Sequence, residues 1–98
     1  MRLDLSGFVE DDLEVIAEFV AEGNPRRALS FLGEIRAKFA VIACNPLLYR
    51  VRGEIGVDAR AGVVGQYVIL FRIVGKRVRI ERVIYGGRDL VELLADEQ

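Results

Sequence analysis

The triplet Gly23-Asn24-Pro25 constrains the fold of this chain more than any other feature, because it separates two long stretches of helical periodicity. Glycine favours a helix end, asparagine favours an N-cap, and proline is tolerated in the first turn of the next helix. The apolar positions at helical spacing are Leu13, Ile16, Ala17 and Val20 before the triplet, and Ala28, Leu32, Ile35, Phe39 and Ile42 after it, with Phe31 beside them. The sequence therefore predicts an antiparallel helical hairpin with one apolar face, ending at Asn45-Pro46.

Alternating and β-branched segments on both sides of this hairpin predict a small sheet. The expected strands cover residues 2–5, 58–64, 67–74 and 77–84, and a short terminal helix is expected over residues 89–95. Gly75-Lys76 is a two-residue hairpin connection, so the last strands are expected to pair antiparallel. The predicted fold class is α+β, a single domain over residues 1–98 with a helical hairpin packed on an antiparallel sheet. Its predicted order is strand, helix, helix, three strands and a short helix.

Arg82 interrupts the alternation of the last predicted strand. Val78 and Ile80 occupy core positions, Arg82 takes the next core position, and Val83 and Ile84 are both apolar. A β-bulge, or the end of the sheet, near Arg82 would account for this change of phase.

The charges are distributed unevenly along the chain. The net charge is −1, but residues 50–88 hold nine cations and only three acids, and eight of these cations are arginine. Arginine binds phosphates and carboxylates through a planar fork, so the bias favours recognition of an anionic surface. Two other interpretations of these arginines stay open. They are solvated residues on an exposed sheet face, or Arg72 and Arg82 form ion pairs with Glu81, Asp89 or Asp58.

The hydrophobic content of the chain, 52%, is high for so small a domain. It favours an apolar surface that a partner covers.

Several kinds of chemistry are disfavoured by composition. The sequence has no histidine and no phosphate-binding glycine loop, and its only cysteine, Cys44, is expected to be a buried small hydrophobic residue. No cofactor, metal or small-molecule substrate is expected. No apolar run is long enough to cross a bilayer and acids occupy the N-terminal segment, so a cytoplasmic protein is expected.

The candidate site residues are four arginines and a tyrosine in or near the predicted sheet. They are Arg60, Arg72, Arg82, Tyr85 and Arg88, with Tyr49 and Tyr67 nearby in the sequence. Such a set can bind phosphate and act as a minimal ribonuclease if a tyrosine pKa is lowered by the cations. The same set can also dock an acidic peptide.

Four segments together resemble the ParE/RelE superfamily of toxins from bacterial type II toxin-antitoxin modules, and its ParE branch in particular. They are Asn24-Pro25, Gly65-Gln66-Tyr67-Val68-Ile69 leading to Phe71-Arg72, Val78-x-Ile80-x-Arg82-Val83, and Gly87-Arg88-Asp89-Leu90. The resemblance implies two N-terminal helices packed on an antiparallel sheet. It also implies a cognate ParD-like antitoxin whose C-terminal segment wraps over a hydrophobic and basic surface of the toxin.

The resemblance also implies a target. ParE-type proteins of plasmid-stabilisation modules inhibit DNA gyrase by trapping it on DNA, whereas RelE-type proteins cleave messenger RNA in the ribosome with a basic, tyrosine-containing site. RelE-like nucleases are usually strongly basic, and a net charge of −1 argues against that branch. The family pattern commonly has a histidine where this chain has Tyr85. Three functions therefore stay open: a gyrase inhibitor, which is not an enzyme, a ribosome-dependent endoribonuclease, and a detoxified module that only binds antitoxin.

Overall fold

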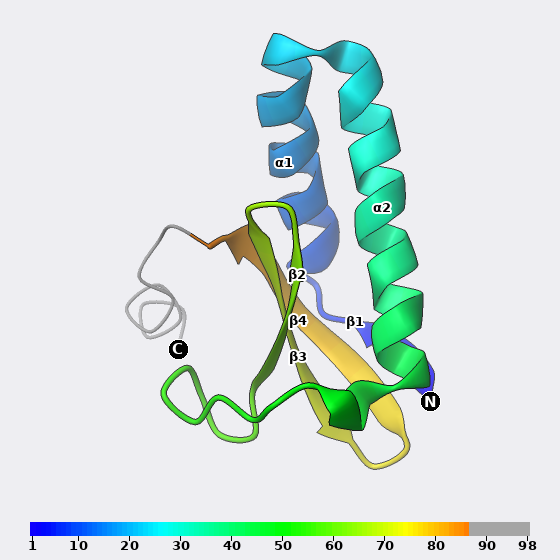
Figure 1. The fold of residues 1–98 in the computed structure, drawn as a ribbon, viewed down its shortest axis with the longest axis vertical. Coiled ribbons are helices and arrows are strands. Elements are labelled where there is room, and N and C mark those ends of the chain that lie inside the picture. The colour runs from blue at the N-terminus through cyan, green and yellow to red at the C-terminus, as the bar shows by residue number, and fades with distance from the viewer. Residues whose placement is uncertain (87–98) are drawn as a thin grey trace.

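The computed structural model describes residues 1–86 and confirms the predicted α+β fold (Figure 1). The elements are β1 (Arg2–Leu5), α1 (Val9–Gly23), α2 (Pro25–Cys44), the short 3-10 helix η1 (Pro46–Leu48), β2 (Arg60–Val64), β3 (Tyr67–Val74) and β4 (Arg77–Tyr85). The helix expected over residues 89–95 lies outside the described residues.

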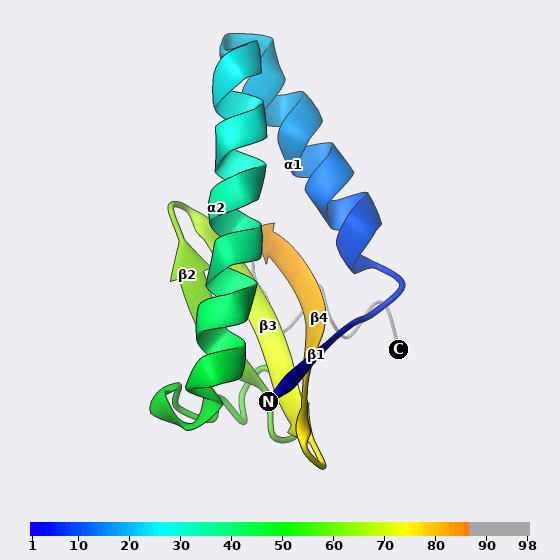
Figure 2. The same ribbon diagram turned by 90° about the vertical axis from the view of Figure 1, so that its right-hand side faces the viewer.

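The helical hairpin forms at the predicted junction. The Asn24 side chain accepts a hydrogen bond from the Arg27 amide (3.2 Å), and Pro25 begins α2, where its missing N–H leaves no partner unsatisfied. The Asn24 amide closes the end of α1 by donating to the Val20 carbonyl (2.9 Å). Figure 2 shows the two helices rising together from one side of the sheet, as the sequence predicted.

The sheet has four strands in the order β1-β4-β3-β2. β2, β3 and β4 pair antiparallel, as their short connections require. β1 lies parallel to β4, with Arg2 opposite Arg77 and Leu5 opposite Ile80, so the sheet is mixed rather than wholly antiparallel. This pairing spans more than 70 residues and is set by the path of the hairpin across the sheet, which local sequence does not encode.

The main core lies between the helices and one face of the sheet. Its buried members are Val9, Leu13, Ile16, Phe31, Ile35, Phe39, Ile42, Ile69, Phe71, Val78, Ile80 and Val83. On the opposite face, Ile55 and Ala59 from the loop before β2 pack on Leu70 and Ile84. The loop therefore covers part of the face that the helices leave open.

The expected irregularity near Arg82 is a β-bulge. Leu70 pairs with Arg82 while Phe71 pairs with Ile80, so Glu81 is the extra residue in β4. The bulge restores the phase and allows both Ile80 and Val83 to be buried on the helix side.

The expectation of a buried Cys44 was wrong, because its side chain is exposed. Ile42 and Ala43 take the buried positions in the last turn of α2, and the next residue therefore faces solvent.

Candidate functional site

A groove of about 590 Å³ opens between α1 and the second half of β4. We call it the α1–β4 groove. It is lined by Asp12, Val15, Ile16 and Phe19 from α1, by Gln66 and Tyr67 near the start of β3, and by Arg82, Val83, Ile84 and Tyr85 from β4. The groove begins where β1 stops pairing with β4, after Ile80.

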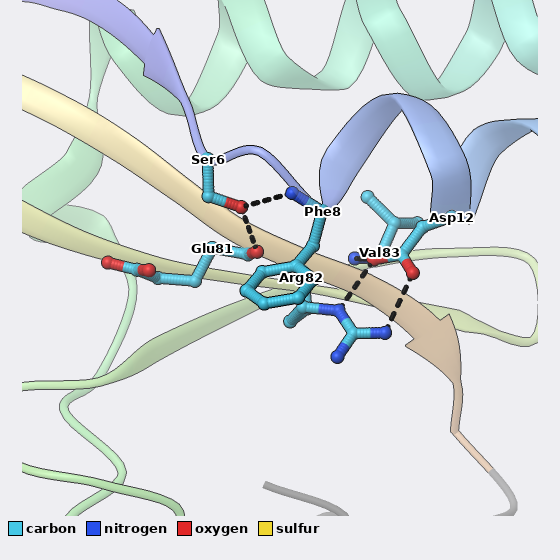
Figure 3. Close-up of polar contacts among 6 residues, drawn as sticks. All are labelled: Ser6, Phe8, Asp12, Glu81, Arg82 and Val83. Atoms are coloured by element: carbon cyan, nitrogen blue, oxygen red, sulfur yellow. Dashed lines mark hydrogen bonds and ion pairs between the residues drawn. The ribbon is translucent and has the colours of Figure 1, made fainter. Parts of the chain in front are cut away.

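An ion pair between α1 and β4 closes one end of the groove (Figure 3). Arg82 donates from Nε and Nη2 to the two carboxylate oxygens of Asp12, each at 2.8 Å. Only 13% of the Arg82 side chain and 11% of the Asp12 side chain are exposed. The hydrogen bonds to Asp12 raise the pKa of Arg82 above its already high value, so the guanidinium stays charged. The Arg82 guanidinium also lies 5.0 Å from the centre of the Phe8 ring, a favourable cation–π contact.

Beyond the end of β1, side chains rather than a strand form hydrogen bonds with the backbone edge of β4. The Ser6 hydroxyl donates to the Glu81 carbonyl (2.5 Å) and accepts from the Phe8 amide (3.3 Å). Asp12 Oδ2 accepts from the Val83 amide (3.0 Å), as Figure 3 shows. These bonds satisfy the edge that the bulge would otherwise leave unpaired, and they fix α1 against the strand.

The helical wall of the groove is apolar and exposed to solvent. Val15 is 64% exposed and Phe19 is 66% exposed, and Phe8, which is 54% exposed, lies just before α1. Positions 8, 15 and 19 recur at seven- and four-residue spacing, so they form one stripe on the helix surface. α1 therefore carries two apolar stripes, one in the core and one beside the groove.

Aromatic rings close the other end of the groove. Tyr85 packs against Tyr67 with ring centres 5.8 Å apart, and Tyr67 packs against Phe31 at 5.6 Å. Burial, with a smaller contribution from the Tyr85 hydroxyl, raises the pKa of Tyr67 above its usual value. Tyr67 therefore stays neutral near pH 7 and presents a polar tip on an apolar body, as is common at binding surfaces.

The structure brings together two of the predicted site residues, Arg82 and Tyr85, both of which line the groove. Arg60 pairs with Phe71 and so lies on the helix side of the sheet, where its Nη1 donates to the Tyr49 carbonyl. Arg72 follows Phe71 and so lies on the opposite side, paired with Arg79. Arg88 lies outside the described residues.

Sequence reasoning missed the α1 contribution to this site. The sequence analysis assigned no role to Asp12, Val15 or Phe19. The signal for them was present, because both apolar residues fall off the core stripe defined by Leu13 and Ile16.

The arrangement is suited to binding a polypeptide. Residues 1–86 contain no group of three or more histidine, cysteine, aspartate or glutamate side chains placed to hold a metal. No helix within the same residues is long and apolar enough to cross a bilayer. An open apolar groove beside a strand edge instead offers hydrophobic contacts and backbone hydrogen bonds to a protein segment.

Comparison with known proteins gives a consistent answer. The family model described as the ParE toxin of the type II toxin-antitoxin system parDE matches residues 3–90. No curated protein matches the chain. A solved structure described as the chromosomal ParDE TA system from P. aeruginosa has the same fold, with a TM-score of 0.75 and 20% identity, covering 87% of this chain and 95% of that one. Because the family model covers most of its length, the chain belongs to the ParE toxin family of type II toxin-antitoxin systems.

Proposed function

We propose that this ParE-family toxin arrests bacterial growth by poisoning DNA gyrase, and that a ParD-like antitoxin neutralises it by docking a segment in the α1–β4 groove. Membership of the family supports the toxin role and a paired antitoxin. The observation that carries the docking site is the exposed apolar wall of the groove, formed by Val15 and Phe19. A cytoplasmic location and a role in plasmid stabilisation belong to the same proposal.

The strand edge at Tyr85 adds a second reason for docking in the groove. The Gly86 amide donates to the Gln66 carbonyl (2.8 Å), so Tyr85 and Tyr67 form a non-hydrogen-bonded pair. In such a pair the backbone N–H and C=O groups point away from the neighbouring strand. Those of Tyr85 therefore face the groove, where none of the strands in residues 1–86 pairs with them.

The hydrophobic contribution of such docking is substantial. Covering a large apolar side chain is worth about 1.5–3 kcal/mol, and Val15, Phe19 and Phe8 are all more than half exposed. A partner that covers all three side chains and pairs with the Tyr85 edge gains both hydrophobic and backbone contacts.

The placement of the arginines supports gyrase over messenger RNA as the target. A ribonuclease of the kind considered from the sequence needs its cations and a tyrosine to converge on one phosphate. Arg60 and Arg72 lie on opposite sides of the sheet, and the Arg82 fork holds Asp12. The neutral Tyr67 is also unsuited to accept a proton at pH 7.

The test is expression of this chain alone in a bacterial host, with supercoiling and DNA cleavage by purified gyrase measured in parallel. We expect growth arrest together with gyrase-dependent DNA cleavage. Arrest with normal gyrase and cut messenger RNA would move the target to the ribosome. Absence of arrest by a folded chain would contradict the toxin activity and leave only antitoxin binding.

Neutralisation is tested with the antitoxin encoded beside the toxin gene. Phe19→Gln should abolish rescue by the antitoxin while leaving the toxin folded, because Phe19 lies on the exposed wall of the groove. Leu29→Gln is the matched control, since Leu29 is equally apolar and 77% exposed but lies on α2. Equal rescue of both variants would place the antitoxin elsewhere.

A further inference from the structure

The outer surface of α1 is strongly acidic. The helix contains six acids and no lysine or arginine. Glu10 and Asp12 form ion pairs with Arg36 and Arg82. The other four, Asp11, Glu14, Glu18 and Glu22, are exposed, and within residues 1–86 none of them forms an ion pair.

Three of these four acids stand beside the apolar wall of the groove. Asp11 precedes Val15 by four residues, and Glu18 follows it by three. Glu22 follows Phe19 by three residues. Side chains three or four positions apart are neighbours on a helix surface, so these carboxylates border the exposed Val15 and Phe19 side chains.

Arg82, the only cation among the described residues that line the groove, does not offset this negative rim. Arg82 gives two hydrogen bonds to the Asp12 carboxylate, and the two charges largely cancel at the groove's end. A segment that fills the groove therefore meets an apolar floor and, along α1, a row of carboxylates that form no ion pair with any other residue that the structure describes.

We infer that the partner segment that occupies the α1–β4 groove is apolar in its centre and carries lysine or arginine at its flanks. This inference rests on the docking role proposed for the groove and names the chemistry of its occupant. Apolar side chains on Val15 and Phe19 supply affinity, while flanking cations near Asp11, Glu18 and Glu22 speed association and fix register. An acidic segment would place like charges against α1 and bind more weakly. The basic surface that the family resemblance led us to expect is therefore not the surface of this groove.

The inference is tested by selecting short peptides from a random displayed library on the immobilised, full-length chain. Peptides are retained only if they lose binding to the Phe19→Gln chain and keep binding to the Leu29→Gln chain. We expect the retained peptides to share apolar anchors flanked by lysine or arginine. Retained peptides with acidic or uncharged flanks would overturn the inference, as would a selection in which no peptide meets the Phe19 criterion.

Charge reversal then tests the role of the α1 acids directly. The retained cationic peptide should bind about tenfold more weakly at low salt to a chain carrying Asp11→Lys and Glu18→Lys, and the difference should shrink as salt is raised. The control carries Glu34→Lys and Glu54→Lys, which change the net charge from −1 to +3 as the first pair does, but outside the groove. If the peptide binds both variants equally weakly, the effect comes from net charge, and a local acidic rim is contradicted.

This outcome is separable from that of the proposed function. Cationic peptides that require Phe19 support the groove chemistry even if gyrase is unaffected by the toxin. Acidic peptides selected on a chain that does poison gyrase would leave the toxin activity standing and overturn only this inference.

Discussion

The two halves of β4 differ in what forms hydrogen bonds with the strand on its β1 side. From Arg77 to Ile80 the strand is flanked by β1 and β3, and its helix-side residues are fully buried. From the bulge to Tyr85 the β1 side of the strand is held by side chains of Ser6 and Asp12, and the edge beyond them opens into the groove.

This difference separates the stabilising part of the sheet from the part available for binding. Backbone pairing on both sides leaves no hydrogen-bonding group for a partner, whereas side-chain capping can stop before the strand ends. The Asp12–Arg82 pair marks the boundary, because it fixes α1 on β4, and beyond it none of the described strands pairs with this edge at Tyr85. The predictions below test that boundary.

The largest expected loss of stability is in the half of β4 that pairs with β1, from Arg77 to Ile80. Ile80→Ala should lower the free energy of unfolding by about 4 kcal/mol, because Ile80 is fully buried and its removal leaves a cavity. Tyr85→Ala, in the open half, should cost about 1 kcal/mol, since Tyr85 is 44% exposed. Urea denaturation of both variants measures the difference. Similar losses would mean that the open half is also part of the stabilising core.

The second largest expected loss of stability is at the Asp12–Arg82 pair. Asp12→Ala should lower the free energy of unfolding by about 3 kcal/mol, because it leaves the mostly buried Arg82 cation and the Val83 amide without the carboxylate. Asp11→Ala is the matched control and should change stability by less than about 0.5 kcal/mol, since Asp11 is exposed. Adding Arg82→Met to Asp12→Ala should restore part of the loss. A neutral Asp12→Ala variant would show that the pair does not hold α1 on the sheet.

Alkaline pH should weaken the aromatic end of the groove. The pKa of Tyr67 is raised in the folded chain from an ordinary value of 10.0, so the unfolded chain loses this proton first. Stability from this group is therefore complete below pH 10 and declines as pH rises from there through the folded pKa. Urea midpoints measured across this range should fall less steeply in Tyr67→Phe than in the parent chain. If the urea midpoints of the two chains fall equally steeply with pH, groups other than Tyr67 cause the loss of stability at alkaline pH.

The smallest effect concerns the second ion pair of α1. Glu10 accepts two hydrogen bonds from Arg36 (3.1 and 2.9 Å), which lower the pKa of Glu10. Its stabilisation is present above the ordinary glutamate pKa and is lost as pH falls through the lowered value. Both side chains are about half exposed, so Glu10→Gln should cost only about 0.5 kcal/mol and the effect should vanish at high salt. A loss as large as that of Asp12→Ala would contradict the distinction between the two pairs.

Much of the fold could be predicted from local sequence. The Asn24-Pro25 junction predicted the helical hairpin, and the Gly75-Lys76 turn predicted the β3–β4 hairpin, because each signal acts through residues a few positions apart. The phase change at Arg82 predicted either a bulge or the end of the sheet there for the same reason, and the structure shows the bulge. The parallel pairing of β1 with β4 was not predicted, since it joins residues more than 70 positions apart.

The candidate site was predicted only in part. Arg82 and Tyr85 were singled out and line the groove, whereas Arg60 and Arg72 were grouped with them but lie on opposite sides of the sheet. The structure confirms that Arg82 forms an ion pair, and Asp12 is a partner that the sequence analysis did not name, whereas the expected partner Asp89 lies outside the described residues. Asp12 comes from α1, and sequence spacing cannot indicate contacts between a helix and a strand 70 residues away.

The sequence by itself determined the helices, the strands and the turns of this ParE-family toxin, because periodicity, caps and turn residues act within one element or between neighbours. It also determined the acidic character of α1. Only the tertiary structure decided that the second stripe of α1 faces a groove, that Asp12 holds Arg82, and that no strand of residues 1–86 pairs with the β1 side of β4 at Tyr85. These features depend on how distant elements pack together, and that packing is a property of the whole chain.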